Sequence, residues 1–333
     1  MTLPRRSQIS LSDTSYYHCI ARCVRRAFLC GEDYYTGQNF EHRRAWLVER
    51  LQLQSKVFGV NICAYAIMSN HYHVVVHVDR KRVMEWSDED VVDRWTTLFS
   101  APPLIRLFRE GGALSKAQRE TVADIITVWR GRLCDLSWYM RCLNEYIARK
   151  ANAEDECTGR FWEGRFKSQA LLGEAALLSC MAYVDLNPVR AKLAATLTDS
   201  DYTSIQVRLR EITLSTEEDS LRRDSALLPF SEGQRNANPG QALPFNLKDY
   251  IDMVDGTARV LRSGKRGVIS KEAPRLVTQL GLSPEQWLDL TLNVQTLQLQ
   301  AIGDINRLEK YSQSSQRCWI QGKSALSRVY AAA

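Results

Sequence analysis

The chain has 333 residues, of which 45% are hydrophobic and 25% are charged, and its formal net charge is +6. This length and composition are typical of a folded globular protein with a sizeable core and up to two domains, and they exclude a low-complexity chain. The basic balance suits a polyanionic partner such as nucleic acid without establishing one.

The nine cysteines are scattered, odd in number and contain no CxxC pair. A disulfide framework or a zinc ribbon is therefore not expected. The N-terminal sequence MTLPRRSQISLSD lacks the apolar core of a signal peptide, and no run approaches the roughly 18 apolar residues of a membrane span. We expect a cytoplasmic protein.

The first half of the chain alternates strand-like and helix-like patterns. Polar and apolar residues alternate in a strand-like way within residues 15–30, whereas apolar residues recur at helical spacing over 40–55. Two further strands are predicted at 60–68 and 71–78, joined by a tight turn. Residues 79–132 are charged and interrupted by Pro-Pro and Gly-Gly pairs, which predicts a helical insertion.

The second half is predicted to be mainly helical. Helices are expected over 135–153 (capped by Asp135), over the strongly apolar 174–186, and over 188–195. Residues 211–244 have few large apolar side chains and are predicted to form a linker. Periodic segments then predict a smaller helical unit over 245–333, with helices at 249–262, 273–280, 284–299 and 317–330.

A histidine pair stands out on the strand predicted at 71–78. His71 and His73 are two residues apart, so both side chains point to the same face of a strand. Two imidazoles on one face can bind a metal ion, but a half-buried strand can also hold histidines that contact water or a backbone carbonyl. The residues alone leave both interpretations open.

A polar line marks the apolar helix predicted at 174–186. Ser179, Tyr183 and Asn187 follow at intervals of four residues and share one helical face. A buried tyrosine hydroxyl and a buried amide need partners. Tyr183 can be a site residue or a core aromatic, and Asn187 can be a ligand or the cap of the helix that Pro188 begins.

Aromatic and basic residues alternate in GRFWEGRFKS, residues 159–168. Such a mixture can stack on bases while its cations pair with phosphates. The same composition also fits a tight turn held to the core by its aromatic rings, with solvated arginines.

Three strings, in this order, resemble those of one family. AIMSNHYHVVV is similar to the histidine–hydrophobic–histidine motif of single-tyrosine HUH endonucleases, and GRFWEGRFKSQ and MAYVDLNPVRA look like segments of REP-associated tyrosine transposases. The resemblance covers residues 15–205. It implies an α+β fold with a ferredoxin-like core, in which an antiparallel sheet carries helices on one side.

The resemblance also implies site residues. Its metal ligands fall on His71, His73 and Asn187, and its nucleophile falls on Tyr183. The implied cofactor is Mg²⁺ or Mn²⁺. Tyr72 stands where an aliphatic residue is more usual, on the opposite face of the strand.

The implied activity is cleavage and rejoining of single-stranded DNA through a 5′-phosphotyrosine intermediate, on hairpins of the repetitive extragenic palindromic (REP) type, in a nucleoid-associated bacterial protein. The resemblance leaves the oligomeric state open between monomer and dimer. The predicted backbone contacts are Arg160, Arg165 and Lys167, with Trp162 and Phe166 stacking on bases or packing.

The predicted domains are a catalytic domain at 1–210, the linker at 211–244 and the C-terminal unit at 245–333. In the C-terminal unit, Arg259, Arg262, Lys265 and Arg266 are candidates for a further DNA contact, and a structural cap is the alternative. A non-catalytic DNA-binding regulator derived from a transposase is the alternative function. A histidine-triad hydrolase does not fit, because Val75 occupies the place of the third histidine.

Overall fold

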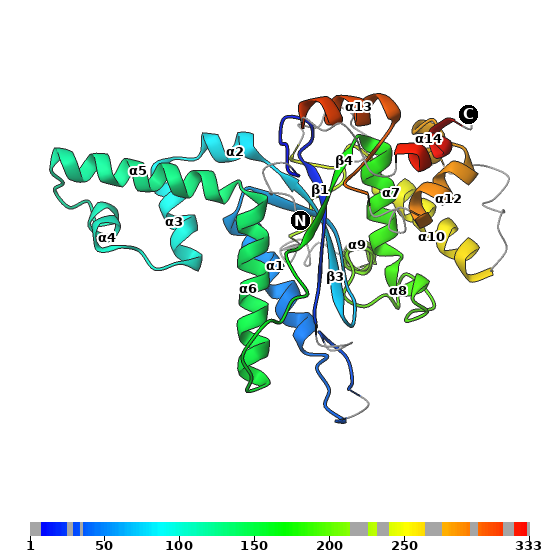
Figure 1. Ribbon diagram of the computed structural model, residues 1–333, viewed down its shortest axis with the longest axis horizontal. Coiled ribbons are helices and arrows are strands. Elements are labelled where there is room, and N and C mark those ends of the chain that lie inside the picture. The colour runs from blue at the N-terminus through cyan, green and yellow to red at the C-terminus, as the bar shows by residue number, and fades with distance from the viewer. Residues whose placement is uncertain are drawn as a thin grey trace.

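The computed structural model describes residues 8–24, 29–33, 36–213, 226–231, 240–263, 275–293, 299–315 and 323–331. Its centre is a five-stranded sheet with the strand order β2-β3-β1-β4-β5 (Figure 1). The strands are β1 (Tyr16–Arg22), β2 (Val60–Ile67), β3 (His71–Val78), β4 (Lys167–Leu172) and β5 (Ala301–Gly303). The protein is therefore mixed α+β, as the sequence predicted.

The sheet is mixed rather than antiparallel, which corrects one expectation. The first four strands pair antiparallel, but β4 and β5 are parallel. The parallel pair arises because a segment from near the C-terminus adds itself to the edge of a sheet whose other strands lie within residues 16–172.

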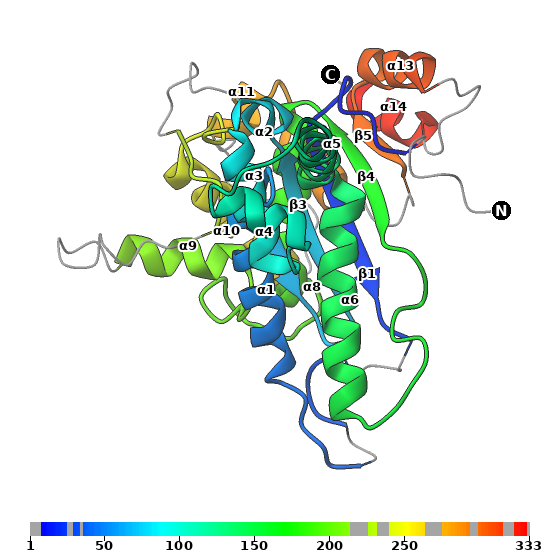
Figure 2. The same ribbon diagram turned by 90° about the vertical axis from the view of Figure 1, so that its left-hand side faces the viewer.

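Helices cover both faces of the sheet, which corrects the expectation of helices on one side only. Because β3 is buried along nearly its whole length, both of its faces need a cover. Helices α1 (Arg43–Val57) and α6 (Leu136–Glu154) lie on one face, and α7 (Glu174–Asp185) lies on the other (Figures 1 and 2).

The side chains of β3 show the two faces directly. Tyr72 is fully buried and donates its hydroxyl to Asn144 Oδ1 on α6 at 2.7 Å. The alternate residues His71 and His73 face α7. As predicted, Tyr72 therefore points away from its two histidine neighbours.

Four helices project from one side of the sheet and lie in the predicted insertion (Figure 1). They are α2 (Arg80–Glu85), α3 (Asp88–Leu98), α4 (Pro103–Arg109) and α5 (Lys116–Leu133). The rings of Trp95 and Trp129 stack between α3 and α5 with their centres 5.0 Å apart. The projection thus has aromatic packing of its own.

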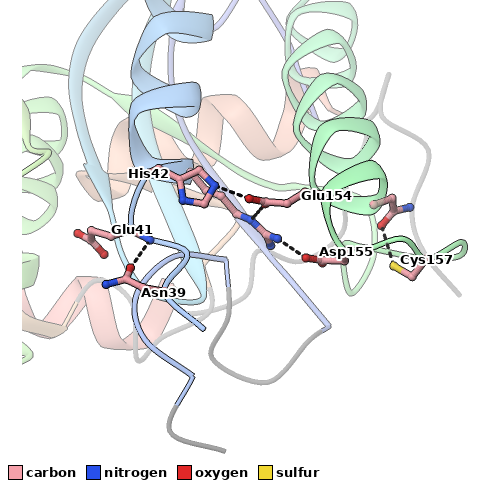
Figure 3. A network of polar contacts seen from close by, with 8 residues as sticks. Asn39, Glu41, His42, Glu154, Asp155 and Cys157 are labelled. Atoms are coloured by element: carbon pink, nitrogen blue, oxygen red, sulfur yellow. Dashed lines mark hydrogen bonds and ion pairs between the residues drawn. The ribbon is translucent and has the colours of Figure 1, made fainter. Parts of the chain in front are cut away.

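The loop between β1 and α1 is held to the end of α6 by charged side chains (Figure 3). His42 Nε2 hydrogen bonds with Glu154 Oε1 at 2.5 Å, and the fully buried Arg43 pairs with Glu154 and Asp155. These contacts join the start of α1 to the end of α6.

The remaining helices are mostly C-terminal: α8 (Asn187–Arg190), α9 (Ser204–Thr213), α10 (Leu247–Ser263), α11 (Arg275–Gln279), α12 (Pro284–Asn293), α13 (Ile305–Ser314) and α14 (Lys323–Ala331). Helix α12 packs on α7, and one hydrophobic core includes residues on both sides of the predicted boundary at 245. The division into domains stays a prediction. Among the described residues, the hydrophobic core is continuous across residue 245.

The predicted linker is described only at 211–213, 226–231 and 240–244. Leu227, Leu228 and Phe230 in it are buried, and the Leu228 amide donates to the carbonyl of Ile62 on β2 at 2.7 Å. This part of the segment is packed on the sheet. Residues 214–225 and 232–239 lie outside the described residues.

Candidate active site

The candidate site lies where α7 packs on the face of the sheet that carries His71 and His73. Their ring centres are 4.9 Å apart, and the Tyr183 ring centre lies 5.8 Å from that of His73. Residues more than a hundred positions apart in sequence thus meet in one cluster. In the sheet, His73 lies opposite Ile20 and His71 lies opposite Arg22 of β1.

Both histidines are held in the neutral form. Burial, reinforced by the neighbouring Arg22, lowers the pKa of His71 to about 4. Burial also lowers the pKa of His73 well below its ordinary value. Neutral imidazoles keep a lone pair, so the pair fits a divalent cation as two nitrogen ligands.

Tyr183 is only 3% exposed, and burial raises its pKa. Arg190 acts in the opposite direction, because its guanidinium carbon lies 4.3 Å from the centre of the Tyr183 ring. The sequence reasoning missed Arg190. Arg190 lies on the short helix α8, after α7 has ended, so the helical spacing along α7 did not mark it.

Asn187 is the first residue of α8, two positions beyond the end of α7, and is buried. Its amide Nδ2 donates to the backbone carbonyl of Tyr183 at 3.4 Å. This contact is local, and the role of Asn187 as third metal ligand stays a prediction. In the described part of the chain, no group of three or more His, Cys, Asp or Glu side chains is arranged to hold a metal ion.

The structure separates the aromatic from the basic residues in 159–168. Trp162 is 9% and Phe166 is 7% exposed, and the Trp162 indole donates to the carbonyl of Asn144 at 2.8 Å. This burial favours the alternative of packing against the core, and stacking of these two rings on bases stays a prediction. Arg160, Arg165 and Lys167 are exposed, as the alternative of a core-anchored turn expects.

Two arginines of the C-terminal unit contact their own chain. Arg259 pairs with Asp255 on the same helix, and Arg262 donates to the carbonyl of Ala195 at 3.0 Å. Lys265 and Arg266 lie outside the described residues.

Two tyrosines on α6 are further candidates for a nucleophile, but they lie across the sheet. Tyr139 is fully buried against Phe58, the residue that follows α1, and Tyr146 lies beneath Arg50 of α1. Both are on the face of Tyr72, away from the histidines. The structure therefore brings only Tyr183, among these three tyrosines, to the histidine pair.

No protein-family profile matches the chain, and neither does any curated protein. A solved structure described as a REP-associated tyrosine transposase bound to a REP hairpin aligns with 64% of this chain and 87% of its own chain. The sequence identity is 11% and the TM-score is 0.36. This similarity is too weak to assign a family or a function. Within the described residues, no helix is both long and apolar enough to cross a membrane.

Proposed function

We propose that this protein is a metal-dependent endonuclease and strand transferase for single-stranded DNA, with Tyr183 as the nucleophile. The observation that carries the proposal is the ring contact between Tyr183 on α7 and His73 on β3, where His73 in turn lies beside His71. The resemblance of three ordered motifs to REP-associated tyrosine transposases adds the substrate class, a hairpin of the REP type. A ferredoxin-like core is part of the same proposal.

The chain's own residues supply a nucleophile and its environment. The hydroxyl oxygen of Tyr183 attacks phosphorus, a bond from this oxygen to phosphorus forms, and the bond from phosphorus to the 3′ oxygen breaks. The proton lost by the phenol is balanced by the proton gained by the 3′ hydroxyl. Rejoining reverses these changes with a second 3′ hydroxyl, so it needs no nucleotide cofactor.

A tyrosine is a weak nucleophile near neutral pH, and burial makes Tyr183 weaker still. Arg190 offsets this effect by stabilising negative charge on the phenol oxygen. His71 and His73, with Asn187 as the predicted third ligand, would hold Mg²⁺ or Mn²⁺, which supplies charge neutralisation at the scissile phosphate.

The test uses a labelled single-stranded hairpin oligonucleotide, the full chain and Mn²⁺. We expect a covalent protein–DNA adduct that survives denaturation and disappears in Tyr183→Phe. Tyr146→Phe is the matched control, because it removes a tyrosine hydroxyl on the opposite face of the sheet, and it should retain the adduct. Binding of the hairpin without any adduct in the wild type would favour the non-catalytic regulator.

A further inference from the structure

A row of polar side chains crosses three adjacent strands beneath α7. Gln169 on β4 contacts His18 on β1, with 2.7 Å between Oε1 and Nδ1. His18 in turn contacts His73 on β3, with 3.0 Å between Nε2 and Nδ1. The two imidazole rings are stacked, with centres 5.2 Å apart. The row thus ends on a residue of the candidate site.

The row begins at a backbone carbonyl, and this fixes the direction of its hydrogen bonds. Gln169 Nε2 donates to the carbonyl of Leu299 at 2.8 Å. A carbonyl can only accept, so the amide nitrogen must face Leu299 and the amide oxygen must face His18. An amide oxygen also only accepts. The proton of His18 therefore lies on Nδ1.

The next bond follows from the neutrality of the rings. His18 is 0% and His73 is 1% exposed, and a charged imidazole buried to this degree would lose its hydration. A neutral ring with its proton on Nδ1 has its lone pair on Nε2, so His18 accepts and Nδ1 of His73 donates.

We propose that Gln169 and His18 are positioning residues that hold His73 as the Nδ1–H tautomer, so that its Nε2 lone pair is directed to metal binding. Partners of this kind fix the ring orientation and the tautomer of a histidine ligand. The use of this lone pair for a metal ion rests on the proposed function, whereas the tautomer itself does not.

The C-terminal segment that contains Leu299 thereby influences the candidate site. Leu299 lies two residues before β5, and the amide of Ala170, next to Gln169, donates to the carbonyl of Gln300 at 2.9 Å. The same segment therefore pairs with β4 and sets the rotation of the Gln169 amide. A segment outside the three motifs thus determines which nitrogen of His73 carries a proton.

The tautomer can be measured directly in the metal-free full chain labelled with ¹⁵N-histidine, by two-bond ¹H–¹⁵N correlation NMR. We expect His18 and His73 as Nδ1–H tautomers, although free imidazole side chains favour Nε2–H. In His18→Phe, which keeps a flat ring but removes the acceptor, the His73 signals should shift toward the Nε2–H pattern. An Nε2–H pattern for His73 in the wild type would overturn the proposal.

The matched control is Gln54→Leu. Gln54 is also fully buried and donates to a backbone carbonyl, that of Tyr139 at 2.8 Å, but it lies on α1 across the sheet. Gln169→Leu should change the His73 pattern, and Gln54→Leu should leave it as in the wild type. Equal changes in both variants would reduce Gln169 to a general packing role and contradict the proposal.

Titration with Mn²⁺, followed by paramagnetic broadening, tests the link to the metal. We expect about 10–100-fold weaker binding in Gln169→Leu and no change in Gln54→Leu. Unchanged affinity in Gln169→Leu would contradict a role toward the ion. The proposed function fails on a different result, the absence of a Tyr183 adduct, so the two failures can be told apart.

Discussion

The guanidinium carbon of Arg190 lies 4.3 Å from the centre of the Tyr183 ring. The same guanidinium donates from Nη2 to the carbonyl of Leu292 on α12 at 3.2 Å. Arg190 therefore connects the candidate nucleophile to a helix of the C-terminal unit. Its cation is fixed beside a phenol whose ionised form burial disfavours.

Substitution of Arg190 should slow adduct formation without abolishing hairpin binding. Arg190→Ala removes the cation that stabilises the phenolate, so we expect a rate loss of about 100-fold, the magnitude typical for one electrostatic group at a reacting oxygen. Arg190→Lys should recover part of this loss, because it keeps the charge but not the planar guanidinium. Single-turnover gel assays give the rates, and equal rates in the wild type and Arg190→Ala would contradict this role.

The helix that carries Tyr183 is anchored to the C-terminal unit through a buried carboxylate. Asp185 accepts from the Tyr250 hydroxyl at 2.6 Å and from the Ile205 amide at 2.9 Å. Tyr250→Phe should lower the free energy of unfolding by about 2 kcal/mol, because a buried charge-assisted hydrogen bond is lost. Urea titration measures the change.

Tyr311→Phe is the control for this prediction. Tyr311 is as buried as Tyr250, but its hydroxyl donates at 3.1 Å to a neutral acceptor, the carbonyl of Gln8. We expect a smaller loss, about 1 kcal/mol. A loss in Tyr311→Phe that equals or exceeds the loss in Tyr250→Phe would show that Asp185 is not a special anchor.

His77 should make stability depend on pH. Burial lowers its pKa from 6.5 to about 4, so the folded state binds fewer protons than the unfolded state between these values. The contribution is complete above the unfolded pKa and is lost as the pH falls toward the folded one. At pH about 5.5 the loss amounts to about 1 kcal/mol.

The measurement compares unfolding free energies at pH about 7.5 and about 5.5. His77→Gln should show a smaller decrease on acidification than the wild type. Gln54→Leu should be destabilised equally at both pH values, because an amide does not titrate. A pH dependence in His77→Gln identical to that of the wild type would refute the assignment to His77.

Arg165 is exposed in the turn before β4 and is predicted to contact the DNA backbone. Arg165→Ala should weaken hairpin binding and reduce the slope of log K against log salt by about 0.7–0.9, the value for one lost phosphate contact. Arg149→Ala is the matched control, because Arg149 is an exposed arginine that pairs with Glu145 on α6. Equal effects of both substitutions on hairpin binding would contradict a contact between Arg165 and the DNA backbone.

Local patterns predicted the parts of the fold that depend on near neighbours. The strand-like segments at 60–68 and 71–78 marked β2 and β3, and the apolar run marked α7, each close to its described bounds. The predicted N-terminal cap of α6 is confirmed, since the Asp135 side chain accepts a hydrogen bond from the amide of Trp138 at 2.9 Å. These features depend on residues a few positions apart.

Long-range pairing could not be predicted in the same way. Strands β4 and β5 are short, and their parallel pairing joins residues about 130 positions apart. His18 and Gln169 were missed because only the register of β1 with β3 and β4 brings them to His73. The pattern showed which residues share a strand face, but not which strands are neighbours.

The central claim is that Tyr183 forms a covalent bond to DNA. Its most direct test is tandem mass spectrometry of the tryptic adduct after incubation of the full chain with a single-stranded hairpin and Mn²⁺, followed by nuclease trimming. The account predicts a 5′-phosphonucleotide on Tyr183. A nucleotide on another residue, or no covalent nucleotide despite hairpin binding, would contradict it.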